Sequence, residues 1–196
     1  MDDSYLTDYF KDIEKIAQRL DLEEIEKAVD ALSFAANNRY GVKVIGLGGS
    51  AANASHFVTD LRKLCGVRAE CLTDNIGEFT AWANDAGFDN VFANIFRSNI
   101  RDDDTILVVL SVGGGDVDRG VSVALIKAIE TAKQCGQTVI SIVGRSQGYA
   151  TKNSDISIIV PEINPGYITP YAESFQSVIC HAIVFHPKML MGKPTW

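Results

Sequence analysis

The hydrophobic positions of this chain follow a helical period at first and later form short apolar runs separated by further helical stretches. Over residues 5–38, apolar side chains recur every three or four positions with a break at Asp21, which predicts two helices. The last predicted helix starts with Thr169 as its capping residue and Pro170 as its first helical residue. After the first two, helices are predicted at residues 51–64, 76–86, 89–97, 121–135 and 169–185.

Five runs rich in β-branched residues predict strands, at residues 42–47, 68–72, 105–110, 138–144 and 156–160. The run at 105–110 is apolar throughout, which is typical of a strand buried on both faces. Strands that alternate with helices predict an α/β fold in which helices cover both faces of a central parallel sheet. Such a three-layer sandwich binds its ligands at the carboxyl ends of the strands.

Composition limits the class of protein. We expect one domain over residues 1–196, because the chain shows no linker, repeat or low-complexity tract. The net charge of −7 argues against a nucleic-acid partner, which would need a broad basic surface. No apolar run is long enough to cross a membrane, and residues 1–4 are acidic, unlike the start of a signal peptide. We therefore expect a cytoplasmic protein with no membrane partner.

Two other features bear on the environment and the assembly of the chain. The cysteines lack metal-binding spacing and lie among apolar residues, which predicts buried free thiols, at Cys65, Cys71, Cys135 and Cys180. The two apolar stripes of the helices in residues 1–38 must cover either the sheet or another subunit. We therefore expect self-association through these helices.

A glycine turn with a serine, residues 46–50 (GLGGS), follows the first predicted strand. Such a turn before a helix offers backbone N–H groups and the positive end of the helix dipole to an anion. A dinucleotide site is disfavoured, because Ala51 stands where that motif requires glycine. A turn that only joins strand to helix is the alternative, and we favour a phosphate or sugar hydroxyl at Ser50.

A second turn of the same kind, residues 111–115 (SVGGG), follows the buried strand. It continues through Asp116 and Asp118 to Arg119 before Ser122 opens the next helix. The two carboxylates would repel a phosphate, so either they point away or Arg119 offsets them.

Acidic and imidazole side chains recur on two predicted helices, where they could move protons or hold a metal. His56 and Asp60 are four residues apart and share a helix face. Glu173 and His181 are eight residues apart, about 12 Å along a helix, so they can lean toward one ligand but not touch. Gln176 competes with Glu173 as the polar partner of His181, and a merely packed or surface histidine is the alternative for His56.

Taken together, these motifs resemble the sugar isomerase (SIS) superfamily and, within it, the phosphoheptose isomerases. The resemblance covers nearly the whole chain and implies a flavodoxin-like domain that forms a homotetramer with active sites at subunit contacts. It rests on the paired N-terminal helices, the GGS turn with residues 51–57, residues 84–87 with 91–92, the serine-glycine loop with residues 126–129, and the acid and histidine helix.

The resemblance also implies residue roles. It assigns one zinc ion per site, with ligands His56, Asp60, Glu173 and His181. Catalysis falls to Asp60, which would remove the proton beside the carbonyl, and to His181, which would return one. The substrate would be bound by Ser50, Asn53, Asn84, Asp85, Ser111, Gly113, Gly114 and Ser122. Without the resemblance, Asn84 and Asp85 indicate only a turn between helices.

The implied reaction is aldose–ketose isomerisation through an enediol, from sedoheptulose 7-phosphate to D-glycero-D-manno-heptose 7-phosphate. It would feed nucleotide-activated heptose for surface polysaccharide. The alternative is a non-catalytic SIS module that binds a sugar phosphate or a protein partner.

The sequence also departs from the family pattern. Asp60 and Glu173 replace a usual Glu and Gln, which adds a negative charge suited to a divalent metal. The family's Ser-Thr-Ser-Gly phosphate loop becomes Ser-Val-Gly-Gly followed by an insertion that ends at Arg119, and Leu47 replaces an asparagine. Another long-chain sugar phosphate is therefore an alternative substrate.

Overall fold

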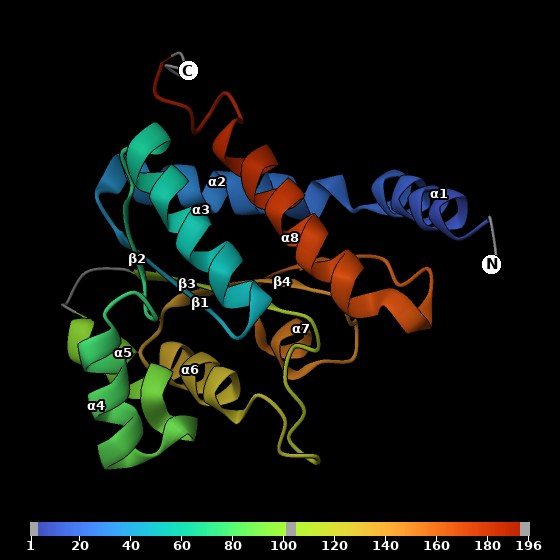
Figure 1. Cartoon of the computed structure of the whole chain (residues 1–196). Helices are drawn as coiled ribbons and strands as arrows, with labels where there is room; N and C mark the ends of the chain where they lie inside the picture. The colour runs from blue at the N-terminus through green and yellow to red at the C-terminus, as the bar shows by residue number, and fades with distance from the viewer. Residues whose placement is uncertain (1–3, 101–104, 193–196) are drawn as a thin grey trace.

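A central sheet of five parallel strands lies between two layers of helices in this computed structural model, which describes residues 4–100 and 105–192 (Figure 1). The acidic residues 1–3, considered above, lie outside the described part. The strand order is β2-β1-β3-β4-β5, which is the flavodoxin order, so the predicted fold class is confirmed. The strands are β1 (Gly41–Gly46), β2 (Arg68–Cys71), β3 (Thr105–Ser111), β4 (Thr138–Val143) and β5 (Ile156–Ile159).

Each face of the sheet has its own hydrophobic core and its own helices (Figure 1). One layer holds α1 (Tyr5–Arg19), α2 (Leu22–Asn38), α3 (Gly49–Cys65) and α8 (Ile168–Val184). The opposite layer holds α4 (Ile76–Ala86), the 3-10 turn η1 (Phe88–Asn90), α5 (Val91–Asn99), α6 (Val123–Gln134) and α7 (Tyr149–Asn153). The two N-terminal helices are therefore confirmed, and α1 extends beyond the sheet at one end of its layer (Figure 1).

The point where the strand order reverses lies between β1 and β3. From β1 the chain moves outward to β2, whereas β3, β4 and β5 follow one another in the other direction. Gly46 at the end of β1 pairs with Leu110 of β3, so the two glycine turns leave the sheet side by side. Ligands of doubly wound α/β proteins bind at this position.

Helices α3 and α8 pack together in the same direction along one face of the sheet. Near their starts, the Asn53 amide donates to the Glu173 backbone oxygen at 2.8 Å and to Gln176 Oε1 at 3.2 Å. Gln176, fully buried, also donates to the carbonyl of Ile142 in β4 at 3.5 Å. Near their ends, the Cys65 thiol lies 3.6 Å from the Val184 oxygen. Successive turns of the two helices therefore face one another.

Some predicted boundaries are wrong, for reasons that lie in the hydrogen bonding. The side chain of Asn164 accepts the Gly166 N–H and starts a 3-10 turn, η2 (Pro165–Tyr167), that continues into α8. Helix α8 thus begins at Ile168, and Thr169 lies inside it rather than capping it.

Other corrections concern α3, α6, α7 and one cysteine. Helix α3 already begins at Gly49, inside the glycine turn. Asp116 and Val121 bond to each other as a short antiparallel bridge, which delays the start of α6 to Val123, and the short α7 was not predicted. Cys135 is exposed at the end of α6, contrary to prediction, whereas the other three thiols are buried. No helix in the described part of the chain is long and apolar enough to cross a membrane.

Candidate functional site

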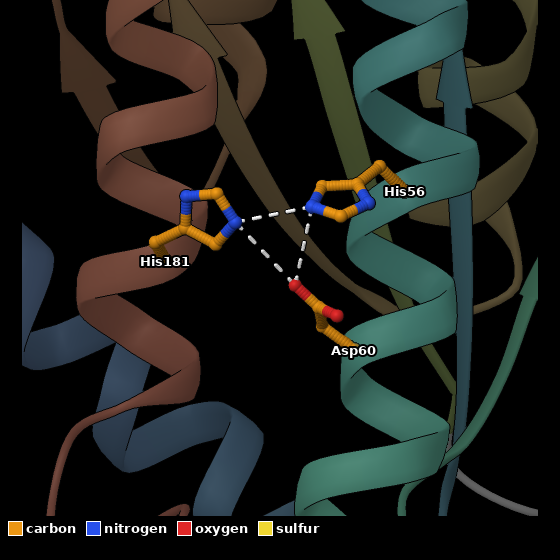
Figure 2. A group of neighbouring side chains, drawn as sticks. All are labelled: His56, Asp60 and His181. Carbon is orange, nitrogen blue, oxygen red and sulfur yellow. Dashed lines mark hydrogen bonds and ion pairs between the residues drawn. The ribbon is translucent and has the colours of Figure 1, made fainter. Parts of the chain in front are cut away.

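Two histidines and an aspartate from α3 and α8 converge on one point (Figure 2). The Nε2 atoms of His56 and His181 lie 3.0 Å apart, and Asp60 Oδ2 lies 3.4 Å from the first and 3.5 Å from the second. The side chain of Asp60 is only 15% exposed, whereas those of His56 and His181 are 54% and 46% exposed. We call these three residues the His-Asp-His group. It is anchored on a mostly buried carboxylate and opens to solvent through its imidazoles.

The local sequence explains this convergence. His56 and Asp60 lie one helical turn apart on α3, so both point from the same face of that helix (Figure 2). The parallel packing of α3 and α8 places His181 opposite that turn. The group therefore depends on the relative position of two helices that are far apart in the sequence.

Two buried thiols lie close enough to Asp60 to feel its charge. Burial, with a smaller contribution from the Asp60 carboxylate, raises the pKa of the Cys65 thiol to about 11. The same two causes raise the pKa of Cys180, the neighbour of His181 in sequence. Both thiols therefore stay protonated at neutral pH and do not compete as thiolate ligands.

The donor atoms of the His-Asp-His group fit a metal ion. Two imidazole nitrogens and one carboxylate oxygen all lie within 4.8 Å of one another. A tetrahedral zinc ion with bonds of about 2.1 Å needs donors about 3.4 Å apart. The three separations in the group lie close to that value, so both the chemistry and the spacing of the donors suit zinc.

Glu173, expected beside these residues, lies elsewhere. Its carboxyl carbon is 2.6 Å from the position that a Cβ on Gly49 would take, so the carboxylate packs on the first turn of α3. Gly49 precedes His56 by seven residues, which is about 10 Å along a helix. The structure thus brings together three of the four residues expected to hold the metal, and it places Glu173 at the glycine turn. Gln176 is buried in the Asn53 and β4 contacts described above.

Ser50, in the first turn of α3, has an unusual hydroxyl group. The residue is 1% exposed, and its Oγ has no hydrogen-bond partner within the part of the chain that the structure describes. A buried polar atom without a partner costs free energy, on the order of 1–3 kcal/mol. A ligand or a water molecule at this turn would remove that cost.

The second glycine turn is bonded largely within itself and to the start of α7. Ser111 Oγ accepts the Gly114 N–H at 3.0 Å. The carbonyl oxygen of Gly114 accepts the Ala150 N–H, and a Cβ on Gly148 would lie 2.3 Å from the Gly113 oxygen. Close packing between two backbone segments therefore accounts for Gly114 and Gly148, whereas a Cβ on Gly113 would meet no atom within 4 Å.

The residues that follow this turn, up to the start of α6, are less buried than the turn itself. Ser122 precedes α6 with a left-handed backbone, φ 55°, and its side chain does not cap the helix. Asp116 accepts the Arg119 N–H at 3.0 Å and lies 3.8 Å from Arg119 Nε, so Arg119 offsets this carboxylate.

Asn84 and Asp85 lie in the last turn of α4, in the layer opposite to the His-Asp-His group. The Asn84 amide donates to Asp85 at 2.8 Å, and both residues are exposed. The structure therefore does not bring them to the group within one chain.

The segment after β4 was not singled out from the sequence. It carries Arg145 and Gly148 and lies next to the second glycine turn, at a carboxyl end of the sheet. The available signal was its position, because it follows a buried strand and contains a glycine, as the two selected turns do.

Comparison with known proteins defines the class. Residues 8–144 match the SIS domain family, so the chain belongs to that family, and the resemblance inferred from the sequence is confirmed. The chain is similar to phosphoheptose isomerase from Mycobacterium tuberculosis, with 33% identity over 168 residues, 81% of this chain and 79% of that protein. A solved phosphoheptose isomerase from Francisella tularensis superposes with a TM-score of 0.79, 26% identity and 92% coverage of both chains.

A second kind of relative is larger. The lincomycin biosynthesis protein LmbN of Streptomyces lincolnensis is 36% identical over 144 residues, which are 70% of this chain. The aligned part makes up 52% of LmbN, so the chain spans about half the length of that relative.

Proposed function

We propose that this chain is a phosphosugar isomerase that interconverts aldose and ketose, with sedoheptulose 7-phosphate as its substrate. The His-Asp-His group carries the proposal, because it places a mostly buried, proton-accepting carboxylate within 3.5 Å of two imidazoles that are open to solvent. The similarity to phosphoheptose isomerases over most of the chain supports the same reaction class.

In the proposed reaction, Asp60 and His181 exchange protons with the substrate. The Asp60 carboxylate takes the proton from the carbon beside the carbonyl, which gives an enediolate. A proton then passes from the neighbouring hydroxyl oxygen to the former carbonyl oxygen, and the His181 imidazole delivers a proton to the former carbonyl carbon. No net proton is consumed. The two side chains lie 3.5 Å apart, so Asp60 can pass the proton that it has taken to His181 after the reaction. The half-exposed imidazole of His181 is open to a bound sugar.

A zinc ion is part of the proposal, held by His56, Asp60 and His181, where it would polarise the substrate carbonyl. Because the converging atoms are the two Nε2 atoms and Asp60 Oδ2, the second Asp60 oxygen and His181 Nδ1 would carry the protons when zinc is bound. In the position described, Glu173 faces the first turn of α3 rather than the metal ligands. We therefore assign Glu173 to the sugar hydroxyls, which a carboxylate can accept as hydrogen-bond donors.

The proposed substrate contacts lie along the two glycine turns. The Ser50 hydroxyl, buried and without a partner in the described residues, is the strongest of them. Asn53 lies one turn further along α3, and the second turn would contribute Ser111, Gly113, Gly114 and Ser122. Asn84 and Asp85 lie in the opposite layer, so they reach a site only across a contact between subunits.

Assembly into a homotetramer is the proposed oligomeric state. Helix α1 exposes a cluster of apolar side chains, with Tyr5 50%, Leu6 65% and Phe10 64% exposed. Exposed apolar clusters of this kind mark interaction surfaces, and a second copy of α1 and α2 would cover this one.

Turnover of a panel of five- to eight-carbon ketose phosphates by the purified full chain tests the proposal. We expect isomerisation of a seven-carbon substrate, with losses of about a thousandfold or more in Asp60→Asn and His181→Ala. Thr59→Ala, on the exposed side of the same helix, is the matched control and should keep full activity. Unchanged isomerisation in either site variant contradicts the assigned roles. Binding of sugar phosphates without turnover would instead identify a non-catalytic module.

A further inference from the structure

Helices α3 and α8 lie side by side along one face of the sheet, and their contact follows one stripe of each helix (Figure 1). On α3 the stripe consists of residues three or four positions apart, Gly49, Asn53, His56 and Asp60. On α8, Glu173 lies at the first of these residues, Gln176 at the second and His181 at the third. The side chains of Asn53 and Gln176, which we call the amide pair, therefore lie between the glycine turn and the His-Asp-His group.

The amide pair is bonded to both helices and to the sheet. Gln176 is fully buried, and its Oε1 accepts a hydrogen bond from Asn53 Nδ2 at 3.2 Å. The same Asn53 nitrogen donates to the Glu173 backbone oxygen at 2.8 Å. Gln176 Nε2 in turn donates to the backbone oxygen of Ile142 in β4 at 3.5 Å. Gln176 thus joins α3, α8 and β4 at one place.

The surroundings of the amide pair favour this one arrangement. The neighbouring buried side chains are apolar, Ala54 and Phe57 on α3 and Phe175 and Ile179 on α8. A buried amide that loses its partners destabilises the fold, because no water replaces the lost hydrogen bonds. A buried polar residue between two parallel helices accordingly selects one alignment, since any other alignment leaves it unpaired.

The His-Asp-His group requires a fixed alignment of the two helices. Gln176 precedes His181 by five residues, about 7.5 Å along α8, so it acts on the group only through the helix. A shift of α8 by one residue would move His181 by about 1.5 Å along the helix axis. Metal–ligand distances tolerate changes of only about 0.2 Å.

We propose that Gln176 is a positioning residue, which fixes α8 against α3 so that the His181 imidazole meets His56 and Asp60. As far as it concerns zinc, this inference rests on the proposed function. The placement of the imidazoles in the metal-free chain does not.

Gln176→Met tests the proposal, because methionine keeps the length of the side chain and removes both of its hydrogen bonds. Nitrogen NMR of the imidazoles in the metal-free full chain reports whether the Nε2 atoms of His56 and His181 share a hydrogen bond. The chain has only three histidines, so single variants assign the signals. We expect Gln176→Met to lose the shared hydrogen bond and to leave the His186 signal unchanged. The Kd for zinc, measured against a competing chelator, should rise by about tenfold or more, because fewer molecules hold the ligands together.

Ser141→Ala is the matched control. It also removes a buried hydrogen bond, which Ser141 donates to Ser157 at 3.0 Å. Because side chains alternate along a strand, Ser141 points away from the face on which Ile140 and Ile142 pack with α3 and α8. This variant should leave the imidazole signals and the Kd for zinc unchanged.

The proposal would be overturned if the wild type lacked the shared hydrogen bond of His56 and His181, or if folded Gln176→Met retained it. A lower Tm with unchanged imidazole signals would show that the amide of Gln176 serves the fold alone. If the wild type binds no zinc, the proposed zinc ion is wrong, and the metal-free imidazole signals still test the role of Gln176.

A length exchange within the amide pair tests the proposal if Gln176→Met does not fold. Gln176→Asn shortens the pair by one methylene group and should lose the shared hydrogen bond of the imidazoles. Adding Asn53→Gln restores the combined length and should recover it. Equal signals in the single and the double variant would contradict the proposal.

Discussion

The carboxylate of Glu173 occupies the space in which Gly49 would carry a side chain. A Cβ at residue 49 would lie 2.6 Å from the carboxyl carbon and from both carboxyl oxygens of Glu173. The absence of a side chain at the first residue of α3 is therefore what allows an acidic group from α8 to rest on that turn. Both residues belong to the part of the molecule where we propose that the sugar binds.

Gly49→Ala should displace Glu173, and a double-mutant cycle with Glu173→Ala can show it. In the Glu173→Ala background, Ala at position 49 should raise the free energy of unfolding by up to about 1 kcal/mol, as expected for glycine replaced within a helix. In the wild-type background the clash should cancel or reverse that gain. Denaturant unfolding of the four proteins measures the coupling, and strictly additive effects would contradict the contact.

Zinc should stabilise the metal-free chain through the His-Asp-His group. At a free zinc concentration of about a hundred times the Kd, the expected gain is about 2.7 kcal/mol, visible as a raised Tm. His56→Ala should lose most of this gain. His186→Ala is the control, because His186 lies near Glu26 at 3.4 Å instead. An equal zinc response in wild type and His56→Ala would exclude the proposed ligand set.

Asp12 should make the attachment of α1 dependent on pH. A hydrogen bond from Lys15, followed by smaller effects that include Asn164 and Tyr171, lowers the pKa of Asp12 below its ordinary value of 3.8. The ionised carboxylate thus stabilises the fold above the ordinary pKa, and this contribution disappears as the pH falls through the lower folded-state pKa.

Asp12→Asn should accordingly lower the Tm at pH 7, and the deficit should shrink in acid below about pH 4. Burial, with the Asp12 charge second, raises the pKa of Tyr171 to about 12, so Tyr171 remains a donor throughout this range. Asp8→Asn, which removes an exposed carboxylate of the same helix, should change the Tm much less. A deficit that persists undiminished in acid would show that ionisation of Asp12 is not the cause.

Charges on the exposed face of α1 should dissociate the proposed tetramer. Leu6→Asp with Phe10→Asp places two carboxylates in the apolar cluster and should shift the mass measured by light scattering toward smaller species. Thr7→Asp adds charge to an exposed position of the same helix and serves as the control. An unchanged mass in the double variant would mean that α1 does not form the subunit contact.

The strands and most helices could be predicted because their patterns report burial directly. Strand β3 is buried at all of its residues, as its continuous apolar run indicated. Helix starts were less predictable, since they depend on hydrogen bonds between segments. Thr169 has the chemistry of a cap, but the turn that begins at Asn164 had already started the helix upstream.

The candidate site, too, could be predicted only as far as it depends on one segment of the chain. Spacing alone placed His56 and Asp60 on one helical face, and the structure agrees. It could not show which turn of α3 would face Glu173 and which would face His181, because that depends on the packing of two distant segments. Because α3 and α8 pack in parallel, Glu173 lies at Gly49 and His181 lies at His56. The acid and the histidine of α8 therefore belong to two separate places along α3.

The parallel pairing of α3 with α8 also has a consequence for the order of folding. Helix α3 is complete at Cys65, but its partner begins only at Ile168, after four of the five strands have followed it along the chain. During synthesis, almost the entire domain must therefore be made before His181 is available to pack beside His56 and Asp60. Acquisition of zinc would then report the last docking step, and a chain interrupted before α8 would carry two ligands but no site.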